Sequence, residues 1–185
     1  MPLIYLAFAA ALAAIWVVEN QGGSVPVSSS ALGPSLLPGS LIQAAADAIR
    51  ANIIQPLGLP STALKYLLAQ SSLETNRWQS NVFARTNSLF NRHRGNGKIG
   101  VPNSDGFWTG EIFNASPSDP DLRIYSDIGQ SARDMAQLLQ DPLYSAALSA
   151  LRQGGANYPQ AVAAAGFSAT AGYASAIAAN VGEFS

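Results

Sequence analysis

The distribution of apolar residues divides the chain into three parts, of which the first is the most apolar. Residues 3–18 (LIYLAFAAALAAIWVV) carry no charged side chain. As a helix, about 16 residues span about 24 Å, which is a short crossing of a bilayer core of about 30 Å. Tyr5 and Trp16 lie near its two ends, where amphipathic rings favour the headgroup level. We therefore expect residues 1–19 to form an N-terminal hydrophobic helix that anchors the chain in a membrane.

Two other interpretations of this stretch stay open. A cleaved signal peptide would account for small-x-small triplets such as Ala11-Leu12-Ala13, although no Lys or Arg precedes the apolar run. A buried core helix would account for the absence of a polar face. Residues 20–40 (NQGGSVPVSSSALGPSLLPGS) are rich in Gly, Ser and Pro, and they predict a flexible to semi-extended tether. Neither flank offers the basic residues from which an orientation in the membrane could be predicted.

The remaining residues, 41–185, have the size of one domain and predict mainly helices. A helix over 41–54 is followed by Pro56 and Gly58, which end it. Ser61 is expected to cap a second helix, over 62–74. Apolar and small residues run nearly all the way round that helix, as is typical of a helix buried at the centre of a domain. Further helices are predicted at about 128–140, 143–153, 158–165 and 170–182, with Gly154-Gly155 and Gly166 as stops.

Between these helices, residues 95–125 combine many Gly, Asn, Asp and Pro residues with short apolar runs. The runs are Ile99-Gly100-Val101, Phe107-Trp108-Thr109 and Leu122 to Tyr125. This pattern predicts a small β-hairpin lobe with long loops. The order of helices, a small β lobe and more helices predicts an α+β fold.

Composition narrows the chemistry that this domain can perform. The chain of 185 residues has no Cys and one His, which excludes disulfides and thiolate sites and argues against zinc sites built from several His residues. Its 10 basic and 11 acidic side chains give a net charge of −1, so we expect no basic surface for nucleic acid. We expect no metal and no other cofactor. Carboxylates remain as the main candidates for catalysis.

Glu74 is the first candidate, because it ends the predicted buried helix in the segment LLAQSSLET. A carboxylate at a helix C-terminus meets the negative end of the helix dipole, and a carboxylate on an apolar helix is poorly solvated. Both effects are expected to raise the pKa of Glu74, and a raised pKa is what the general acid of a glycosidase needs. An ordinary surface Glu at a frayed helix end is the alternative interpretation.

A second carboxylate is expected from the β lobe. Glu111, in the segment FWTGEIF, lies between aromatic and β-branched residues typical of a strand, and it is our second catalytic candidate. Asp105, Asp119 and Asp121 are also available, but they fall in turn-like segments such as SPSDPD, where Asp is common for backbone reasons. A solvated charge on the face of a strand is the alternative interpretation of Glu111.

Aromatic residues are concentrated between the two acids, and aromatic faces can stack on sugar rings. They are Trp78, Phe83, Phe90, Phe107 and Trp108. We take Trp78, Phe90 and Trp108 as candidate substrate-binding residues, although core packing is the commoner use of such side chains. Residues 92–98 (RHRGNGK) form a small basic loop, which either meets an anionic substrate or is simply solvated.

Two longer stretches carry a set of motifs in a fixed order. The first is GLPSTALKYLLAQSSLET, after which Asn87-Ser88-Leu89-Phe90 follows. The second is LRIYSDIGQSARDMAQLLQDPLYSAAL, which continues into AAAGFSATAGYASAIAANV. In this order they resemble the glucosaminidase family of peptidoglycan hydrolases, with its Leu-Ala-Gln helix ending in Leu-Glu-Ser/Thr, its Asn-Asn-Leu-Phe, its Phe-Arg-x-Tyr with Ser-x-x-Asp, and its Gly-Tyr-Ala-Thr-Asp ending. The resemblance covers about residues 55–184.

The resemblance implies a lysozyme-like α+β fold that cleaves the β-1,4 bond between N-acetylglucosamine and N-acetylmuramic acid in peptidoglycan glycan strands. By this resemblance, Glu74 matches the catalytic acid of the family. Glu111 lies near the place where family members carry a second acidic residue on the β lobe, and the acetamido group of the substrate is an alternative to that residue. Tyr173 matches a late tyrosine of the family, and we expect Tyr173 and Asn87 to bind substrate.

Departures from the family pattern keep other functions open. Asn91-Arg92-His93 stands where the family has Gly-Ile-Lys, Trp78 falls one residue later than usual, and Phe167 and Ala171 replace a tyrosine and an aspartate. A lytic transglycosylase needs only one acid, although its typical Gly-Leu-Met-Gln motif is missing here. A non-catalytic module that binds the cell wall is the third possibility.

The predicted anchor and tether also suggest where such a hydrolase would work. We expect the domain to face the cell wall from a membrane, either on the periplasmic or extracellular side of a bacterium or in a membrane-containing phage particle that opens a host wall.

Overall fold

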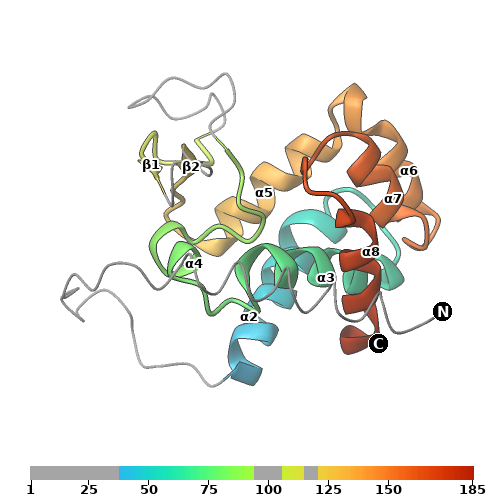
Figure 1. Cartoon of the computed structure of the whole chain (residues 1–185), viewed down its shortest axis with the longest axis horizontal. Coiled ribbons are helices and arrows are strands. Elements are labelled where there is room, and N and C mark those ends of the chain that lie inside the picture. Colours follow the sequence, from blue (N-terminus) through green and yellow to red (C-terminus); the bar gives the residue numbers. More distant parts are fainter. Residues whose placement is uncertain (1–37, 94–105, 115–120) are drawn as a thin grey trace. The chain divides into compact units, whose positions relative to one another are not determined.

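Helices form most of the part of the chain that the structure describes, residues 38–93, 106–114 and 121–185 of a computed structural model (Figure 1). These residues belong to one compact unit, which spans residues 36–185. The anchor predicted at residues 1–19 and the tether predicted at 20–40, apart from residues 38–40, lie outside the described part. Among the described residues, no helix combines the length and the apolar character that a membrane crossing requires.

Short helical segments follow one another along the chain, with a pair of strands between them. In order they are α2 (Pro38–Ile49), the π-helical turn η1 (Arg50–Ile54), the 3-10 turn η2 (Ser61–Ala63), α3 (Leu64–Thr75), α4 (Asn81–Thr86), β1 (Ile112–Phe113), β2 (Leu122–Arg123), α5 (Ile128–Leu139), the 3-10 turn η3 (Pro142–Tyr144), α6 (Ser145–Arg152), α7 (Tyr158–Ala164), α8 (Tyr173–Asn180) and the 3-10 turn η4 (Val181–Phe184).

The helices predicted from the sequence are confirmed, with small shifts of their ends. α2 and η1 together cover the helix predicted at 41–54, and α5 to α8 fall on the helices predicted after residue 125. The prediction that Ser61 caps the second helix is wrong. Ser61 lies inside η2, which follows the extended residue Pro60, and no side chain caps this turn. Helix α3 then begins at Leu64.

Helix α4 is an element that the apolar pattern did not predict. The Oγ atom of Ser80 caps it by accepting a hydrogen bond of 3.0 Å from the backbone nitrogen of Phe83. The helix ends at Asn87, whose φ of 51° is left-handed. Its 6 residues are too few for a helical period of apolar positions to be visible in the sequence.

Helix α3 is buried around most of its circumference, as predicted. Its buried residues are Leu67, Leu68, Ala69, Gln70, Ser71, Ser72 and Thr75. Buried amide and hydroxyl groups cost free energy unless they form hydrogen bonds, so the polar members of this set need partners inside the domain. Gln70 and Ser71 find partners in other segments, and Oγ1 of Thr75 donates to the carbonyl of Ser71 within α3.

The β lobe is built around an antiparallel pair of strands. Within the described residues, Ile112 of β1 pairs with Arg123 of β2, and Phe113 pairs with Leu122. The strand predicted at 107–109 is wrong, because these residues form a loop whose Thr109 nitrogen donates a 3.0 Å hydrogen bond to the carbonyl of Ile124. The run at 99–101 lies outside the described residues.

A buried ion pair attaches the β lobe to α5. Asp134 of α5 is 2% exposed, and its two carboxylate oxygens accept hydrogen bonds of 2.8 and 2.9 Å from Nη1 of Arg123. The hydroxyl of Tyr125 donates to the same carboxylate over 2.5 Å. The guanidinium also lies over the ring of Trp108, 5.3 Å from its centroid. A buried charge is tolerated when it is paired in this way, so the network fixes the lobe on the helical part.

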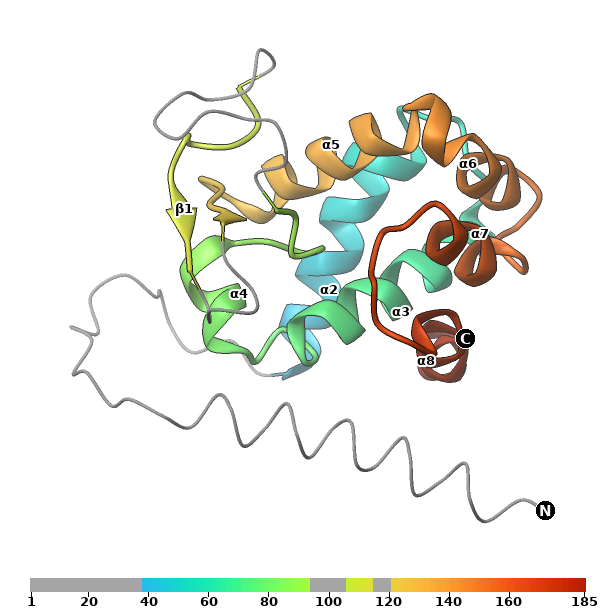
Figure 2. The same cartoon turned by 45° about the horizontal axis from the view of Figure 1, so that its top comes forward.

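The elements are arranged on either side of α3 (Figures 1 and 2). The strands and α4 lie beyond its C-terminal end, and α7 and α8 lie on the other side of the domain, where α8 packs against α3. The C-terminal end of α3 is therefore placed between the β lobe and the last two helices.

Candidate active site

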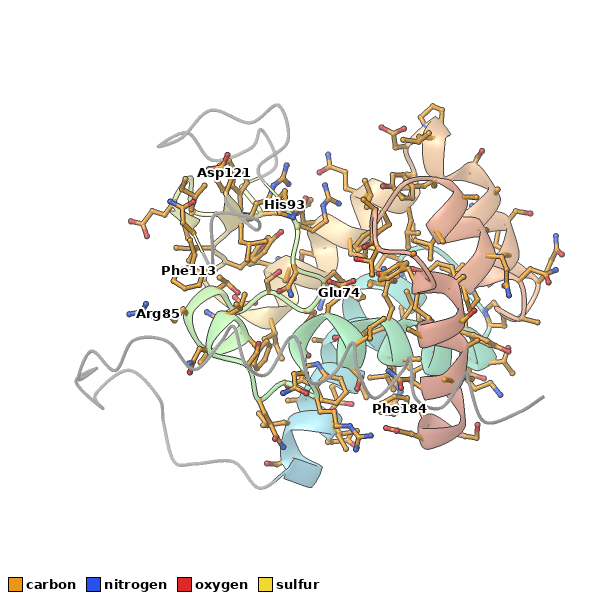
Figure 3. All side chains as sticks on the ribbon, in the orientation of Figure 1. Glu74, Arg85, His93, Phe113, Asp121 and Phe184 are labelled. Atoms are coloured by element: carbon orange, nitrogen blue, oxygen red, sulfur yellow. The ribbon has the colours of Figure 1, made fainter. Side chains whose placement is uncertain are left out.

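Glu74 lies at the C-terminal end of α3, one residue before the helix ends at Thr75. Its side chain is half-buried, and Figure 3 shows it near the middle of the domain, between the labelled residues of the β lobe and the ribbon of α8. The helix ends here because Asn76 adopts the left-handed conformation, with φ 48°. The sequence prediction that Glu74 terminates the buried helix agrees with this placement.

An unusual turn follows Glu74 directly. Asn76, Arg77 and Trp78 have φ values of 48°, 57° and 60°, and none of them is glycine. Each left-handed residue of this kind costs about 1–2 kcal/mol and persists only where its surroundings hold it. The backbone nitrogen of Trp78 donates to Oγ1 of Thr75 over 2.9 Å, and its indole Nε1 donates to Oγ of Ser71 over 2.9 Å. These bonds fix the backbone next to Glu74.

Both the carboxylate and the carbonyl of Glu74 receive hydrogen bonds from distant parts of the chain. The hydroxyl of Tyr173, the first residue of α8, donates to Oε1 of Glu74 over 2.5 Å. The side-chain amide of Asn91 donates to the carbonyl oxygen of Glu74. Asn91 has φ 42°, so its backbone takes the left-handed conformation in the segment that leads into the β lobe. The loop before the lobe and the start of α8 therefore meet at Glu74.

Tyr173 is itself held by two other side chains. Nε2 of Gln70 donates to the Tyr173 hydroxyl over 3.0 Å, and the hydroxyl of Tyr158 donates to Oε1 of Gln70. Phe167 lies parallel to the Tyr173 ring, with 6.0 Å between the ring centroids. Burial, the nearby charge of Glu74 and the hydrogen bond to Glu74 raise the pKa of Tyr173 above its ordinary value. The Tyr173 hydroxyl therefore keeps its proton and stays a donor at neutral pH.

Glu111 lies on the β lobe immediately before β1, and its side chain is exposed. Its backbone nitrogen donates to Oγ1 of Thr109 over 3.2 Å, and its carbonyl accepts a hydrogen bond of 3.2 Å from Ile124. These bonds fix the backbone of Glu111 beside the sheet and leave its carboxylate to the solvent. Its assignment as the second catalytic carboxylate stays a prediction.

The aromatic candidates for sugar binding lie in the interior. Trp78, Phe90 and Trp108 are 4%, 0% and 1% exposed, so their rings present almost no face to a ligand. The ring of Trp78 meets that of Phe184 edge-on, with the centroids 6.1 Å apart. The structure therefore places these side chains in the core, which is the alternative interpretation that the sequence left open.

Asn87 also has a structural partner. Its side-chain amide donates to the carbonyl of Tyr125 over 2.9 Å and to that of Ser126 over 3.4 Å. Asn87 is half-buried and ends α4, so its amide joins α4 to the chain that leaves β2. Tyr173, which was also predicted to bind substrate, forms a hydrogen bond with Glu74.

The basic loop lies partly outside the described residues. Arg92 points its Nη1 to the carbonyl of Asp134, 3.4 Å away, and is only half exposed. His93 is exposed and forms an isolated β-bridge with Leu122. In the described ranges, no group of three or more His, Cys, Asp or Glu side chains is placed to hold a metal ion.

Gln70, Tyr158 and Asn91 belong to this site but were not singled out as site residues from the sequence. Gln70 gave a usable signal, because an amide in the middle of a buried helix must find a hydrogen-bond partner. Asn91 gave a second signal, because it stands where the resembling family has glycine and asparagine tolerates a left-handed backbone. Tyr158 gave none, because a tyrosine at the start of a helix has no distinctive pattern.

The fold has a counterpart among solved structures. It is similar to the crystal structure of the catalytic domain of the autolysin Auto from Listeria monocytogenes, with a TM-score of 0.51 and 21% sequence identity. The similarity covers 86% of this chain and 97% of that domain. No family model matches the chain, and no curated protein matches its sequence. The comparison shows that the chain shares the fold of this catalytic domain.

Proposed function

We propose that the protein is a peptidoglycan hydrolase in which Glu74 is the general acid. The observation that carries the proposal is the position of Glu74, half-buried at the end of a central helix and bonded through Oε1 to Tyr173. Two further points support it: the ordered motifs of the sequence and the fold shared with an autolysin catalytic domain.

The proposed substrate bond is the β-1,4 bond between N-acetylglucosamine and N-acetylmuramic acid. Glu74 gives its proton to the glycosidic oxygen, and a water molecule then completes the hydrolysis at the anomeric carbon. Glu111 is the proposed group that activates this water or stabilises the positive charge of the transition state, with the acetamido group of the substrate as the alternative. The distance between the carboxyl groups of Glu74 and Glu111 in the substrate complex would decide the stereochemistry. A separation of about 5–5.5 Å is typical of hydrolysis that retains the anomeric configuration, and one of about 6.5–9.5 Å is typical of hydrolysis that inverts it.

The proposed location follows from the N-terminal stretch. We place the hydrolase on a membrane through residues 1–19, with residues 20–40 as a tether that lets the domain reach the cell wall. A membrane-containing phage particle is one setting in which an anchored hydrolase of this kind would open a host wall. Detection of the protein in the membrane fraction of purified virions, and its loss from that fraction when residues 1–19 are removed, would support this part of the proposal.

Fragment analysis tests the proposed bond. The full chain is incubated with purified peptidoglycan, and the released fragments are identified by mass spectrometry. We expect new reducing ends on N-acetylglucosamine. New reducing ends on N-acetylmuramic acid would contradict the proposed bond, and anhydro-muramic ends would identify a lytic transglycosylase. Binding to peptidoglycan without any released fragment would identify a non-catalytic module.

Substitution of Glu111 separates the two versions of the mechanism. If Glu111 acts on the water or the transition state, Glu111→Gln lowers kcat by roughly 100-fold or more, as is typical of a lost general base. If the acetamido group serves instead, Glu111→Gln retains most of the activity. Asp47→Asn is the control, because Asp47 is an exposed carboxylate on α2 that pairs with Arg50.

A further inference from the structure

A chain of hydrogen bonds runs through the interior to the carboxylate of Glu74. The hydroxyl of Tyr158 donates to Oε1 of Gln70, Nε2 of Gln70 donates to the hydroxyl of Tyr173 over 3.0 Å, and that hydroxyl donates to Oε1 of Glu74 over 2.5 Å. Tyr158 and Gln70 are 0% exposed and Tyr173 is 6% exposed. The four residues come from α7, α3 and α8, so the chain joins three helices.

Chemistry fixes the direction of each hydrogen bond in this chain. The amide nitrogen of Gln70 only donates, so the oxygen of Tyr173 accepts from it and the single hydrogen of the Tyr173 hydroxyl is directed to Oε1 of Glu74. Oε1 accepts this hydrogen both in the carboxylate and in a carboxyl group that carries its proton on the other oxygen. The amide oxygen of Gln70 consequently faces Tyr158 and receives the hydrogen of its hydroxyl. In each of these three hydrogen bonds, the donor therefore lies on the side away from Glu74 and its hydrogen points toward Glu74.

We infer that Gln70 and Tyr158 are positioning residues of the proposed reaction, which hold the Tyr173 hydroxyl as a donor to Oε1 of Glu74. The inference rests on the proposed role of Glu74 as general acid. In that step the proton of Glu74 goes to the glycosidic oxygen, the bond from the anomeric carbon to that oxygen breaks with its electron pair on the oxygen, and Glu74 becomes a carboxylate. Because Oε1 accepts from Tyr173, the other carboxyl oxygen of Glu74 carries the proton that is transferred.

The oriented hydroxyl favours the transition state over the bound substrate. A hydrogen bond to an ionised acceptor is roughly twice as strong as one to a neutral acceptor. The bond from Tyr173 therefore strengthens as Glu74 loses its proton and gains negative charge. An interaction that is stronger in the transition state than in the ground state raises kcat and leaves KM nearly unchanged. Without Gln70 and Tyr158, the Tyr173 hydroxyl is free to rotate away from Glu74.

Tyr158→Phe in the full chain is the first test. It removes the first donor of the series, which two further hydrogen bonds separate from Glu74. We expect kcat on soluble peptidoglycan fragments to fall by about three- to ten-fold, with KM within about two-fold, as for the loss of one buried hydrogen bond. Tyr125→Phe removes the hydroxyl of another buried tyrosine, which donates to Asp134, and is expected to keep the parent kcat.

The same substitution in the Tyr173→Phe background distinguishes positioning from a merely structural effect. If Tyr158 acts through Tyr173, Tyr158→Phe has no further effect on kcat once the Tyr173 hydroxyl is gone. Equal losses of kcat in the two backgrounds, or an effect on KM alone, would overturn the inference. Gln70→Met keeps the length of the side chain without its amide and serves as a second variant, with the same expectations.

A measurement that needs no substrate separates this inference from the proposed function. With 13C-labelled glutamate carboxyl groups, we expect the Glu74 resonance to move in Tyr158→Phe and in Tyr173→Phe and to stay in place in Tyr125→Phe. If the Glu74 resonance moves in Tyr158→Phe but the parent shows no lytic activity, the result would contradict the proposed function and support the coupling of Tyr158 to Glu74. Lytic activity together with an unmoved Glu74 resonance in Tyr158→Phe would contradict the inference and leave the proposed function standing.

Discussion

The hydroxyl of Tyr173 and the Oε1 atom of Glu74 are 2.5 Å apart, although the two residues lie 99 positions apart in the chain. This contact places the first residue of α8 at the last turn of α3. It also gives the carboxylate of Glu74 a neutral donor in a largely buried setting, because Tyr173 is 6% exposed. The last helices of the chain are therefore part of the candidate site and not only packing around it.

Asn91 is expected to stabilise the end of α3 in two separable ways, through its left-handed backbone and through its bond to the Glu74 carbonyl. Asn91→Gly keeps the backbone conformation and loses the bond, for a cost of about 1 kcal/mol. Asn91→Ala loses the bond and adds the left-handed cost of about 1–2 kcal/mol. Thermal unfolding should rank the parent above Asn91→Gly and Asn91→Gly above Asn91→Ala. Equal stability of the two variants would contradict the described backbone.

The Arg123–Asp134 ion pair is expected to be essential for attaching the β lobe. Asp134→Ala removes the buried carboxylate that accepts hydrogen bonds from Arg123 and Tyr125, so the free energy of unfolding should fall by about 3–5 kcal/mol. The exposed pair between Asp47 and Arg50 provides the control, and Asp47→Ala should cost no more than about 1 kcal/mol. Urea unfolding measures both values. Similar costs for the two substitutions would show that the Arg123 network is not buried as described.

The glycine pair that ends α6 is expected to differ in its tolerance of a methyl group. A Cβ on Gly155 would lie 2.2 Å from the Cδ2 atom of the Tyr66 ring, whereas a Cβ on Gly154 has its nearest neighbour, Oγ1 of Thr62, at 3.3 Å. Both residues have positive φ, 96° at Gly154 and 94° at Gly155, so the backbone cost of alanine is shared. Gly155→Ala should be less stable than Gly154→Ala by about 1–3 kcal/mol, the usual cost of overpacking. Equal melting temperatures would argue against the close approach of Tyr66.

Alkaline pH is expected to unfold the protein through its buried tyrosines. Burial, followed by the charge of a nearby carboxylate, raises the pKa values of Tyr125, Tyr158 and Tyr173 above 10. Below pH 10 these groups are protonated in both states and their full contribution to stability is present. Above pH 10 the unfolded chain releases the protons and the folded chain keeps them, so stability falls by about 1.4 kcal/mol per pH unit for each tyrosine.

Unfolding monitored by circular dichroism, together with phenolate absorbance, checks this expectation. The absorbance of these three tyrosines should appear only with the loss of helical signal. Phenolate that forms at about pH 10 in a chain that is still folded would mean that the three hydroxyls are accessible. Below pH 9 the tyrosines should produce no change in stability.

The helices and the position of Glu74 could be predicted from the sequence because they depend on local patterns. Apolar residues around a whole helix predict burial, and the left-handed stop after Thr75 leaves Glu74 at the helix end. The partners of Glu74 could not be predicted in this way. Tyr158, Tyr173 and Asn91 come from segments distant from α3 in the sequence, and Gln70, although it lies on α3, is linked to Glu74 through Tyr173. A tyrosine whose hydroxyl forms a hydrogen bond has the same sequence pattern as a tyrosine that only packs.

The aromatic residues show the opposite difficulty. Trp78, Phe90 and Trp108 have the composition of a sugar-binding surface, but composition does not reveal which way a ring points. The loop at 107–109 and the short strand at 112–113 explain part of this result, because a loop that folds back on Ile124 turns Trp108 into the interior, under Arg123.

The measurement that tests the central claim most directly is the clearing of a peptidoglycan suspension by the full chain and by Glu74→Gln. The glutamine variant keeps the size of the side chain but cannot donate the carboxyl proton. We expect the parent to clear the suspension and Glu74→Gln to be slower by about 100-fold or more, while Asp47→Asn acts like the parent. A Glu74→Gln protein that folds like the parent and clears the suspension at the parent rate would contradict the assignment of Glu74 as the general acid.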